Sequence, residues 1–168
     1  MERDFFENLI VLMKKHKFWD TQPIMHSKRK LQKEGEITAF KASEQAKEPL
    51  PLPDGFEFDT FDVTDDATVN DICKFIEEHY VESSDFRVIY TPEKFRWALM
   101  TPGWVQEYHF VVRNSKNKKI MALMVGCPKK YILLGKTITM LEGNFFAIHK
   151  KLRNKRLAPI MSQEMFRR

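Results

Sequence analysis

The spacing of apolar residues predicts a strand followed by two helices in the middle of the chain. In residues 56–61, phenylalanines alternate with acidic residues, a period of two that is typical of a strand. Apolar residues then recur at helical spacing over residues 69–80. A second, shorter helix is expected to begin at Thr91, which can cap it, with Pro92 in its first turn.

The segments that follow predict an antiparallel hairpin. Residues 106–113 and 119–126 are strand-like, and they flank the polar turn 114–118. Residues 131–134 are expected to add a short edge strand.

The last part of the chain combines an apolar strand, a basic turn and a helix. Residues 138–148 are apolar and partly alternating, and apolar residues recur at helical spacing from Leu157 onward. Between these segments, five cations fall within seven residues: Lys150, Lys151, Arg153, Lys155 and Arg156. They lie at or just before a helix N-terminus, where backbone N–H groups and the helix dipole favour an anion. A multiply charged phosphate would relieve their mutual repulsion; a solvated basic turn or a nucleic-acid footprint is the alternative.

Gly143 interrupts the apolar strand that leads to this basic turn. A glycine inside a strand indicates a bulge, or a place where another molecule approaches the backbone. A bulge frees backbone N–H groups from the sheet ladder. Free donors a few residues before a phosphate-binding turn suggest a ligand with a polar reactive group and a polyphosphate, such as an acyl-CoA.

Composition and charge narrow the class of protein. A chain of 168 residues with 43% hydrophobic and 30% charged residues suits one globular domain. The net charge of +5 implies anionic partners, but the excess lies at residues 14–30 and 149–168, without a repeated RNA-binding aromatic motif. We therefore expect no general nucleic-acid binding.

Cysteine usage and hydropathy indicate a compartment. Cys73 and Cys127 both lie in apolar surroundings and are expected to be buried thiols. The sequence has no signal peptide and no long apolar run, so a reducing cytoplasm without stable membrane insertion is the expectation.

Two strings in the sequence carry a resemblance to a known family. Residues 142–159, EGNFFAIHKKLRNKRLAP, closely resemble the signature of the myristoyl-CoA:protein N-myristoyltransferases. Residues 18–23, FWDTQP, resemble the N-terminal arm that folds over the bound acyl-CoA in that family. The first string departs from the family at four positions. The family usually has isoleucine where this chain has Gly143, leucine for Phe146, cysteine for Ala147 and serine for Asn154.

The resemblance implies a fold and a division of the chain. It implies an α+β (α/β) fold like that of the GCN5-related acyltransferases, with a mixed, mainly antiparallel sheet flanked by helices and truncated before its last strands. Residues 1–53 are then an arm and linker that cover the acyl-CoA site, and residues 54–168 are the acyl-CoA-binding domain. On this interpretation the chain is the N-terminal half of a longer transferase.

The resemblance also assigns functional residues. The backbone N–H groups of Phe145 and Phe146 are implied as the oxyanion hole. Contacts with the acyl-CoA are implied at Lys17, Phe18, Trp19, Phe145, Phe146, Ala147, Ile148, Asn154, Arg156, Leu157 and Ala158. Contacts with the peptide substrate are implied at Val81, Asp85, Phe86 and Arg87. Neither a metal nor a prosthetic group is expected, and myristoyl-CoA is the acyl donor.

His149 is the residue in this string that invites a catalytic interpretation. A histidine can act as a general base, but no Ser, Cys or carboxylate partner is identifiable beside it in the sequence. We therefore expect a structural role for His149.

The leading hypothesis is an enzyme that transfers myristate from myristoyl-CoA to N-terminal glycines of proteins. The family takes its general base from its own C-terminal carboxylate and much of its peptide groove from a second half. The 168-residue chain is therefore expected to bind myristoyl-CoA but not to turn over alone. The alternatives are a stand-alone acetyltransferase of the GCN5-related type and a non-catalytic basic module for nucleic acid or a membrane surface.

Overall fold

The computed structural model describes residues 41–44, 46–81, 85–86 and 88–168. The chain divides into two compact units, Met1–Gln45 and Ala46–Arg168. In the first unit, the 3-10 turn η2 (Ala42–Glu44) is described, with an ion pair of 2.7 Å between Lys41 Nζ and Glu44 Oε1. The FWDTQP string and Arg87 lie outside the described residues.

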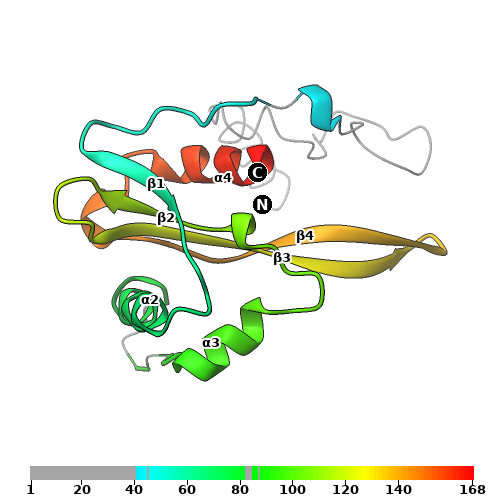
Figure 1. Ribbon diagram of the computed structural model, residues 1–168, viewed down its shortest axis with the longest axis horizontal. Coiled ribbons are helices and arrows are strands. Elements are labelled where there is room, and N and C mark those ends of the chain that lie inside the picture. Colours follow the sequence, from blue (N-terminus) through cyan, green and yellow to red (C-terminus); the bar gives the residue numbers. More distant parts are fainter. Residues whose placement is uncertain (1–40, 45, 82–84, 87) are drawn as a thin grey trace, which may run out of the picture. The chain divides into compact units, whose positions relative to one another are not determined.

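The second unit is built on a four-stranded antiparallel sheet in the order β1-β2-β3-β4 (Figure 1). The strands are β1 (Phe56–Thr60), β2 (His109–Asn114), β3 (Ile120–Leu133) and β4 (Lys136–Ile148). The predicted first strand, the hairpin and the last strand are confirmed. The α+β class is confirmed as well.

Two details of the hairpin prediction were wrong. Residues 106–108 form a 3-10 turn, η3 (Gln106–Tyr108), and the ladder begins only where His109 lies opposite Val125. Residues 131–133 are not a separate edge strand but the end of β3. Leu134 and Gly135 both have positive φ, 51° and 74°, which suits a tight two-residue turn and lets β3 and β4 continue as one long ribbon.

Helices cover both faces of the sheet. The helices α2 (Asp66–His79) and α3 (Pro92–Leu99) lie on one face, and α4 (Leu157–Arg167) lies on the other (Figure 1). The three helices predicted from residue 69 onward are confirmed. The sequence also specifies two of their starts: Asp65 Oδ2 accepts the Thr68 N–H at 2.8 Å, and Thr91 Oγ1 accepts the Lys94 N–H at 3.3 Å.

Alternation along the strands creates one apolar cluster on each face. In β3, Leu123 and Val125 face α2 and α3, whereas Ala122 faces α4. Cys73 and Cys127 belong to the first cluster and are buried thiols outside any disulfide, as predicted, and burial raises the pKa of each. Among the helices that the structure describes, none has the length and hydropathy needed to cross a membrane.

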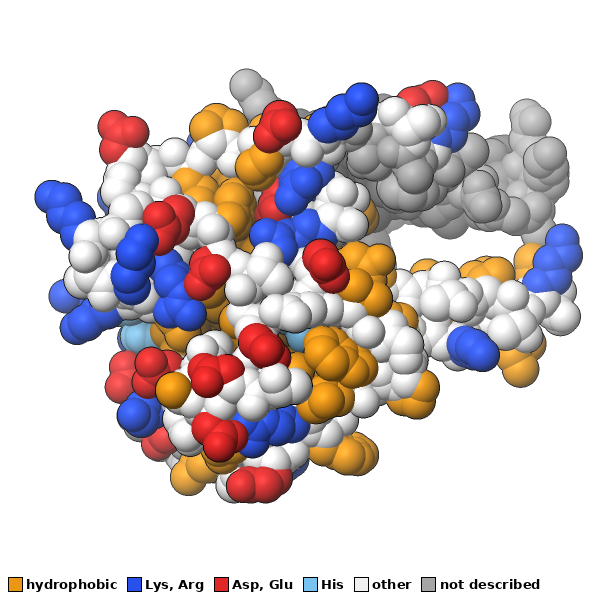
Figure 2. All heavy atoms as spheres, viewed as in Figure 1, with side chains coloured by type: hydrophobic (Ala, Val, Ile, Leu, Met, Phe, Trp, Pro, Cys, Tyr) orange, Lys and Arg blue, Asp and Glu red, His pale blue; other side chains and the backbone are white. Residues whose placement is uncertain are grey.

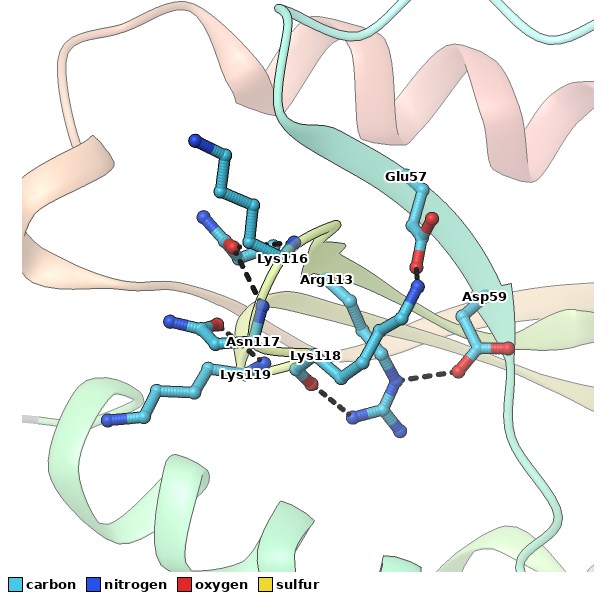
Figure 3. Close-up of polar contacts among 8 residues, drawn as sticks. Glu57, Asp59, Arg113, Lys116, Asn117, Lys118 and Lys119 are labelled. Atoms are coloured by element: carbon cyan, nitrogen blue, oxygen red, sulfur yellow. Dashed lines mark hydrogen bonds and ion pairs between the residues drawn. The ribbon is translucent and has the colours of Figure 1, made fainter.

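Polar contacts fasten β1 to the β2–β3 hairpin (Figure 3). Arg113 Nε donates to Asp59 Oδ2 at 2.6 Å, and its Nη1 donates to the Lys118 carbonyl at 3.0 Å. Lys118 Nζ pairs with Glu57 Oε1 at 2.5 Å. These partly exposed pairs add little stability, but they fix the β2–β3 turn against the start of β1.

The last residues of α4 are fixed by a buried carboxylate. Glu164 is 1% exposed and accepts hydrogen bonds of 2.7 Å from Arg167 and Arg168. Arg168 Nη1 donates hydrogen bonds to Thr60 Oγ1 at 2.7 Å and to the Glu107 carbonyl at 2.8 Å. Burial alone would raise the pKa of Glu164, but its two arginine partners lower it overall.

Candidate functional site

A pocket of about 430 Å³ lies where the C-terminal end of α2 meets the end of β4. Its lining comes from three segments of the chain. These are His79 and Tyr80 at the end of α2, Phe146, Ala147 and Ile148 on β4, and Arg153 in the basic turn. The pocket therefore joins the apolar strand and the cationic turn that the sequence singled out.

The pairing of β3 with β4 contains one extra residue beside this pocket. Val125 pairs with Asn144 and Leu123 pairs with Ala147, so Met124 alone lies opposite both Phe145 and Phe146. The sequence placed the bulge at Gly143, and that position is wrong. Gly143 is regularly paired with Gly126, and the bulge lies two residues further on.

Phe145 has an unusual backbone conformation in this bulge. Its φ is 47°, in the left-handed region that bulky residues rarely adopt. Its N–H donates to the side-chain oxygen of the preceding residue, Asn144 Oδ1, at 2.8 Å. The N–H of Phe145 has thus left the sheet ladder.

Three aromatic rings surround the buried side chain of Phe145. The ring centroids of Tyr80, Tyr90 and Phe95 lie 5.8, 5.2 and 5.1 Å from that of Phe145. Such pairs contribute about 0.5–1.5 kcal/mol each beyond their burial. A left-handed residue costs roughly 1–3 kcal/mol, so the three contacts together are large enough to offset it.

The basic turn leads from β4 into α4 through the 3-10 turn η4 (Lys150–Leu152). Asn154 and Arg156 have φ of 69° and 59°, and Arg156 is the N-cap of α4. No side chain of the described residues caps this helix, so its positive end is open to an anion. Figure 2 shows Lys and Arg side chains at this end of the sheet, where the β2–β3 turn also lies.

Arg153 and two histidines connect the basic turn with α2. Arg153 Nη2 donates to the His79 carbonyl at 2.7 Å, and its Nε donates to the Ile148 carbonyl at 3.4 Å. The rings of His79 and His149 lie 4.2 Å apart. Burial lowers the pKa of both histidines, and His149 lowers that of His79 further. His149 Nδ1 accepts the Lys151 N–H at 3.2 Å, a contact that agrees with the structural role expected for it.

The structure brings most of the residues implied for acyl-CoA binding into one region. Phe146, Ala147 and Ile148 line the pocket, while Asn154, Arg156, Leu157 and Ala158 lie at the start of α4. Two side chains point elsewhere: that of Phe145 is buried among the rings, and that of Leu157 packs in the cluster under α4. In both cases only the backbone remains for a ligand. Lys17, Phe18 and Trp19 lie outside the described residues.

The residues implied for peptide binding are only partly described. Val81, Asp85 and Phe86 are exposed, beyond the end of α2. They do not line the pocket.

Three pocket residues were missing from the assignment made on the sequence. His79 and Tyr80 end α2, and helical periodicity alone does not distinguish a pocket residue from a core residue at such a position. Arg153 belonged to the cationic run, in which no cation stood out from its neighbours.

Comparison with known proteins identifies the chain. The family model described as "Myristoyl-CoA:protein N-myristoyltransferase, N-terminal domain" matches residues 36–168. The fold is thus that of the N-terminal domain of an acyltransferase family. Within that class, the chain belongs to the myristoyl-CoA:protein N-myristoyltransferase family, and it carries the N-terminal domain. The resemblance noted in the sequence is confirmed.

Relatives and solved structures agree with this assignment. The chain is 40% identical over 160 residues to a glycylpeptide N-tetradecanoyltransferase of Ajellomyces capsulatus, with 93% of this chain and 30% of the relative covered. It is 41% identical over 157 residues to that of Dictyostelium discoideum, with 92% and 38% covered. It thus spans about a third of the length of these relatives.

The fold comparison gives the same result. A crystal structure of Saccharomyces cerevisiae N-myristoyltransferase with bound myristoyl-CoA matches with a TM-score of 0.83 and 38% identity, covering 92% of this chain and 37% of the other. A second such structure matches with a TM-score of 0.86 and 35% identity, covering 99% and 40%.

Proposed function

We propose that the chain binds myristoyl-CoA and, within a complete transferase, serves transfer of the myristoyl group to N-terminal glycines of proteins. One observation carries the proposal: a bulged strand, a pocket and an uncapped basic helix start follow one another along residues 144–158. They do so in a domain similar to one whose solved structure contains bound myristoyl-CoA.

Each part of the site has a proposed role. The N–H groups of Phe145 and Phe146 stabilise the oxyanion that forms when the glycine amine attacks the thioester carbonyl. The new C–N bond replaces the C–S bond, and CoA leaves as the thiolate, which takes up the proton that the amine gives up. The basic turn and the start of α4, from Asn154 to Ala158, hold the phosphates of the CoA.

The remaining assignments are extensions of this proposal. Residues 1–53, with Lys17, Phe18 and Trp19, form the arm that covers the acyl-CoA, and residues 54–168 form the binding domain. Val81, Asp85, Phe86 and Arg87 contact the peptide. We place the protein in the cytoplasm, which the unbonded thiols of Cys73 and Cys127 support.

Isothermal calorimetry with myristoyl-CoA and with free CoA tests the binding proposal. We expect much tighter binding of the acylated form, because each buried methylene contributes about 0.8 kcal/mol. Arg156→Ala should weaken both ligands about tenfold, as expected for loss of a charge-assisted bond to phosphate. The matched control is Lys136→Ala, an equal loss of charge in the distant β3–β4 turn, which should change neither affinity.

Three results would contradict the proposal. Equal affinity for CoA and myristoyl-CoA means that no acyl site exists. An unchanged affinity in Arg156→Ala places that guanidinium in solvent. Salt-dependent binding to arbitrary DNA, together with none to acyl-CoA, identifies a nucleic-acid module instead.

A further inference from the structure

The three rings around Phe145 come from α2, α3 and the residues next to these helices, and not from β4 or the basic turn. Tyr80 follows α2, Tyr90 precedes α3, and Phe95 lies inside α3 and is fully buried. Tyr90 and Phe95 do not line the pocket, and their ring planes make steep angles with that of Phe145, 81° and 71°. They contact the side chain of the proposed oxyanion donor without lining the pocket themselves.

The position of these rings affects the direction of the Phe145 N–H, because the Phe145 ring and the Phe145 backbone cannot turn independently. In the extended conformation of an ordinary strand, a backbone N–H lies in the plane of the sheet and perpendicular to the strand. The left-handed φ of 47° turns this N–H away, to an acceptor outside the ladder. With its side chain buried and in contact with three rings, Phe145 cannot return to the extended form without leaving them.

Asn144 indicates that the freed N–H is within reach of an oxygen that does not belong to the sheet. Its Oδ1 accepts this N–H at 2.8 Å, and its side chain is only half-buried. A thioester oxygen that takes the same N–H has to displace this amide oxygen by rotation of the Asn144 side chain. The donor is therefore satisfied until a ligand arrives.

We propose that Tyr80, Tyr90 and Phe95 are positioning residues of the oxyanion hole, which hold the Phe145 N–H out of the sheet ladder through contacts with the Phe145 ring. The proposal rests on the proposed function, because it takes the thioester oxygen as the ligand of this N–H. It adds that the geometry of the hole is set by α2, α3 and the segment between them, and not by β4 alone.

Tyr90 offers the cleanest test, because it is half-buried and does not line the pocket. The variants are Tyr90→Leu, which removes the ring, and Tyr90→Phe, which keeps it. Trp97→Leu is the matched control, since it removes an aromatic ring from an 80% exposed position on α3, the helix that begins two residues after Tyr90. The two probes are myristoyl-CoA and a thioether analogue with a methylene in place of the thioester carbonyl.

The affinity ratio of the two probes isolates the contact with the carbonyl oxygen. We expect the native chain to prefer the thioester about threefold to tenfold, as one hydrogen bond allows. Tyr90→Leu should lose most of this preference while its affinity for the thioether stays the same. Tyr90→Phe and Trp97→Leu should keep it.

A spectroscopic readout gives an independent check. Bound myristoyl-CoA with a ¹³C-labelled carbonyl should show a lower carbonyl stretching frequency than in water, in the native chain and in Tyr90→Phe. In Tyr90→Leu at saturating protein, this shift should shrink, which a loss of stability alone does not produce. If Tyr90→Leu fails to fold by circular dichroism, Tyr90→Met, with a flexible apolar side chain, takes its place.

The outcomes separate this proposal from the proposed function. Failure of the native chain to bind either probe overturns the proposed function. Binding of both probes with equal affinity overturns the oxyanion role of Phe145 and leaves the acyl-CoA site standing. A Tyr90→Leu variant that keeps the native ratio and the native carbonyl frequency overturns the positioning role of the rings alone.

Discussion

At the scale of single residues, His109 is a buried base packed against aromatic rings. It is fully buried at the start of β2, and neither ring nitrogen has a hydrogen-bond partner among the described residues. Its ring is stacked between those of Phe61 and Trp104, with centroids 5.7 and 5.6 Å away. Burial lowers its pKa from 6.5 to about 4, because a charged imidazole has no solvation in this position.

This pKa makes the stability of the fold depend on pH. Between pH 6.5 and about 4 the unfolded chain binds a proton at His109 and the folded chain does not, so stability is lost as pH falls. The full loss is about 3 kcal/mol. Urea unfolding at pH 7, 6 and 5 should show this decrease, and His109→Phe should reduce it.

The extent to which His109→Phe reduces the pH dependence of stability shows how much of that dependence comes from His109. His79 and His149 also have lowered pKa values and contribute in the same direction, so the variant should keep part of the pH dependence. A variant with the same slope as the native chain would mean that His109 takes up a proton in the folded state.

At the scale of elements, the β3–β4 ribbon depends on one of its two facing glycines. Gly126 and Gly143 are paired, but only Gly126 is crowded: a Cβ there would lie 2.8 Å from Leu141 Cδ2 and 3.0 Å from Met165 Sδ. A Cβ on Gly143 would meet only Met124 Cε, at an ordinary 3.5 Å.

We therefore expect opposite effects from the same substitution at the two positions. Gly126→Ala should destabilise the fold by about 1–3 kcal/mol, because Leu141 of β4 and Met165 of α4 must both move to admit a methyl group. Gly143→Ala should be neutral or stabilise by up to about 1 kcal/mol, since alanine loses less entropy in a strand. Urea unfolding of both variants measures the difference, and equal effects would contradict the close approach at Gly126.

Elements of this fold could be predicted where local chemistry decides them. Thr91 with Pro92 marks the start of α3, and the alternation of residues 56–61 marks β1. The length of β3 could not be predicted, since Pro128 falls inside it, and a proline normally marks the edge or the end of a strand. Its continuation depends on pairing with β4, which is a contact between residues far apart in the sequence.

At the scale of the whole second unit, Glu164 links the C-terminal end of α4 to β1 and η3 through its arginine partners. This carboxylate holds Arg167 and Arg168, and Arg168 reaches β1 and η3 and lies over the Phe110 ring at 4.5 Å. Removal of the carboxylate leaves two arginines without their anion in a largely buried position.

We expect Glu164→Ala to destabilise the unit by about 3–5 kcal/mol, because breaking one partner of a buried pair leaves an uncompensated charge. Thermal and urea unfolding measure this loss. The control is Asp71→Ala, which removes an exposed partner of Lys74 and should change stability by less than about 1 kcal/mol. If both variants lose the same small amount, Glu164 is not the link between α4 and the sheet.

The region of the candidate site could be predicted from the sequence, but its geometry could not. The cationic run and the strand before it are local patterns, and the pocket lies in the region that they predicted. The rings around Phe145 are brought together only by the tertiary fold, from residues 50 to 65 positions away in the sequence. The selection of Arg153 from five cations depends likewise on the carbonyl of His79, at the end of a distant helix.

The extra residue in β4 also changes which of the following residues face each side of the sheet. Before the bulge, Asn144 is in register with Val125; after it, Ala147 is in register with Leu123, on the same face of the sheet. Three positions separate these two residues, and three is an odd number, so an unbroken strand would send them to opposite faces. The number of residues in β4 thus matters apart from their identity. A single deletion between Asn144 and Ala147 would turn every side chain on one side of the deletion to the opposite face of the sheet. Substitutions leave the side-chain directions unchanged, whereas any insertion or deletion of odd length inverts them.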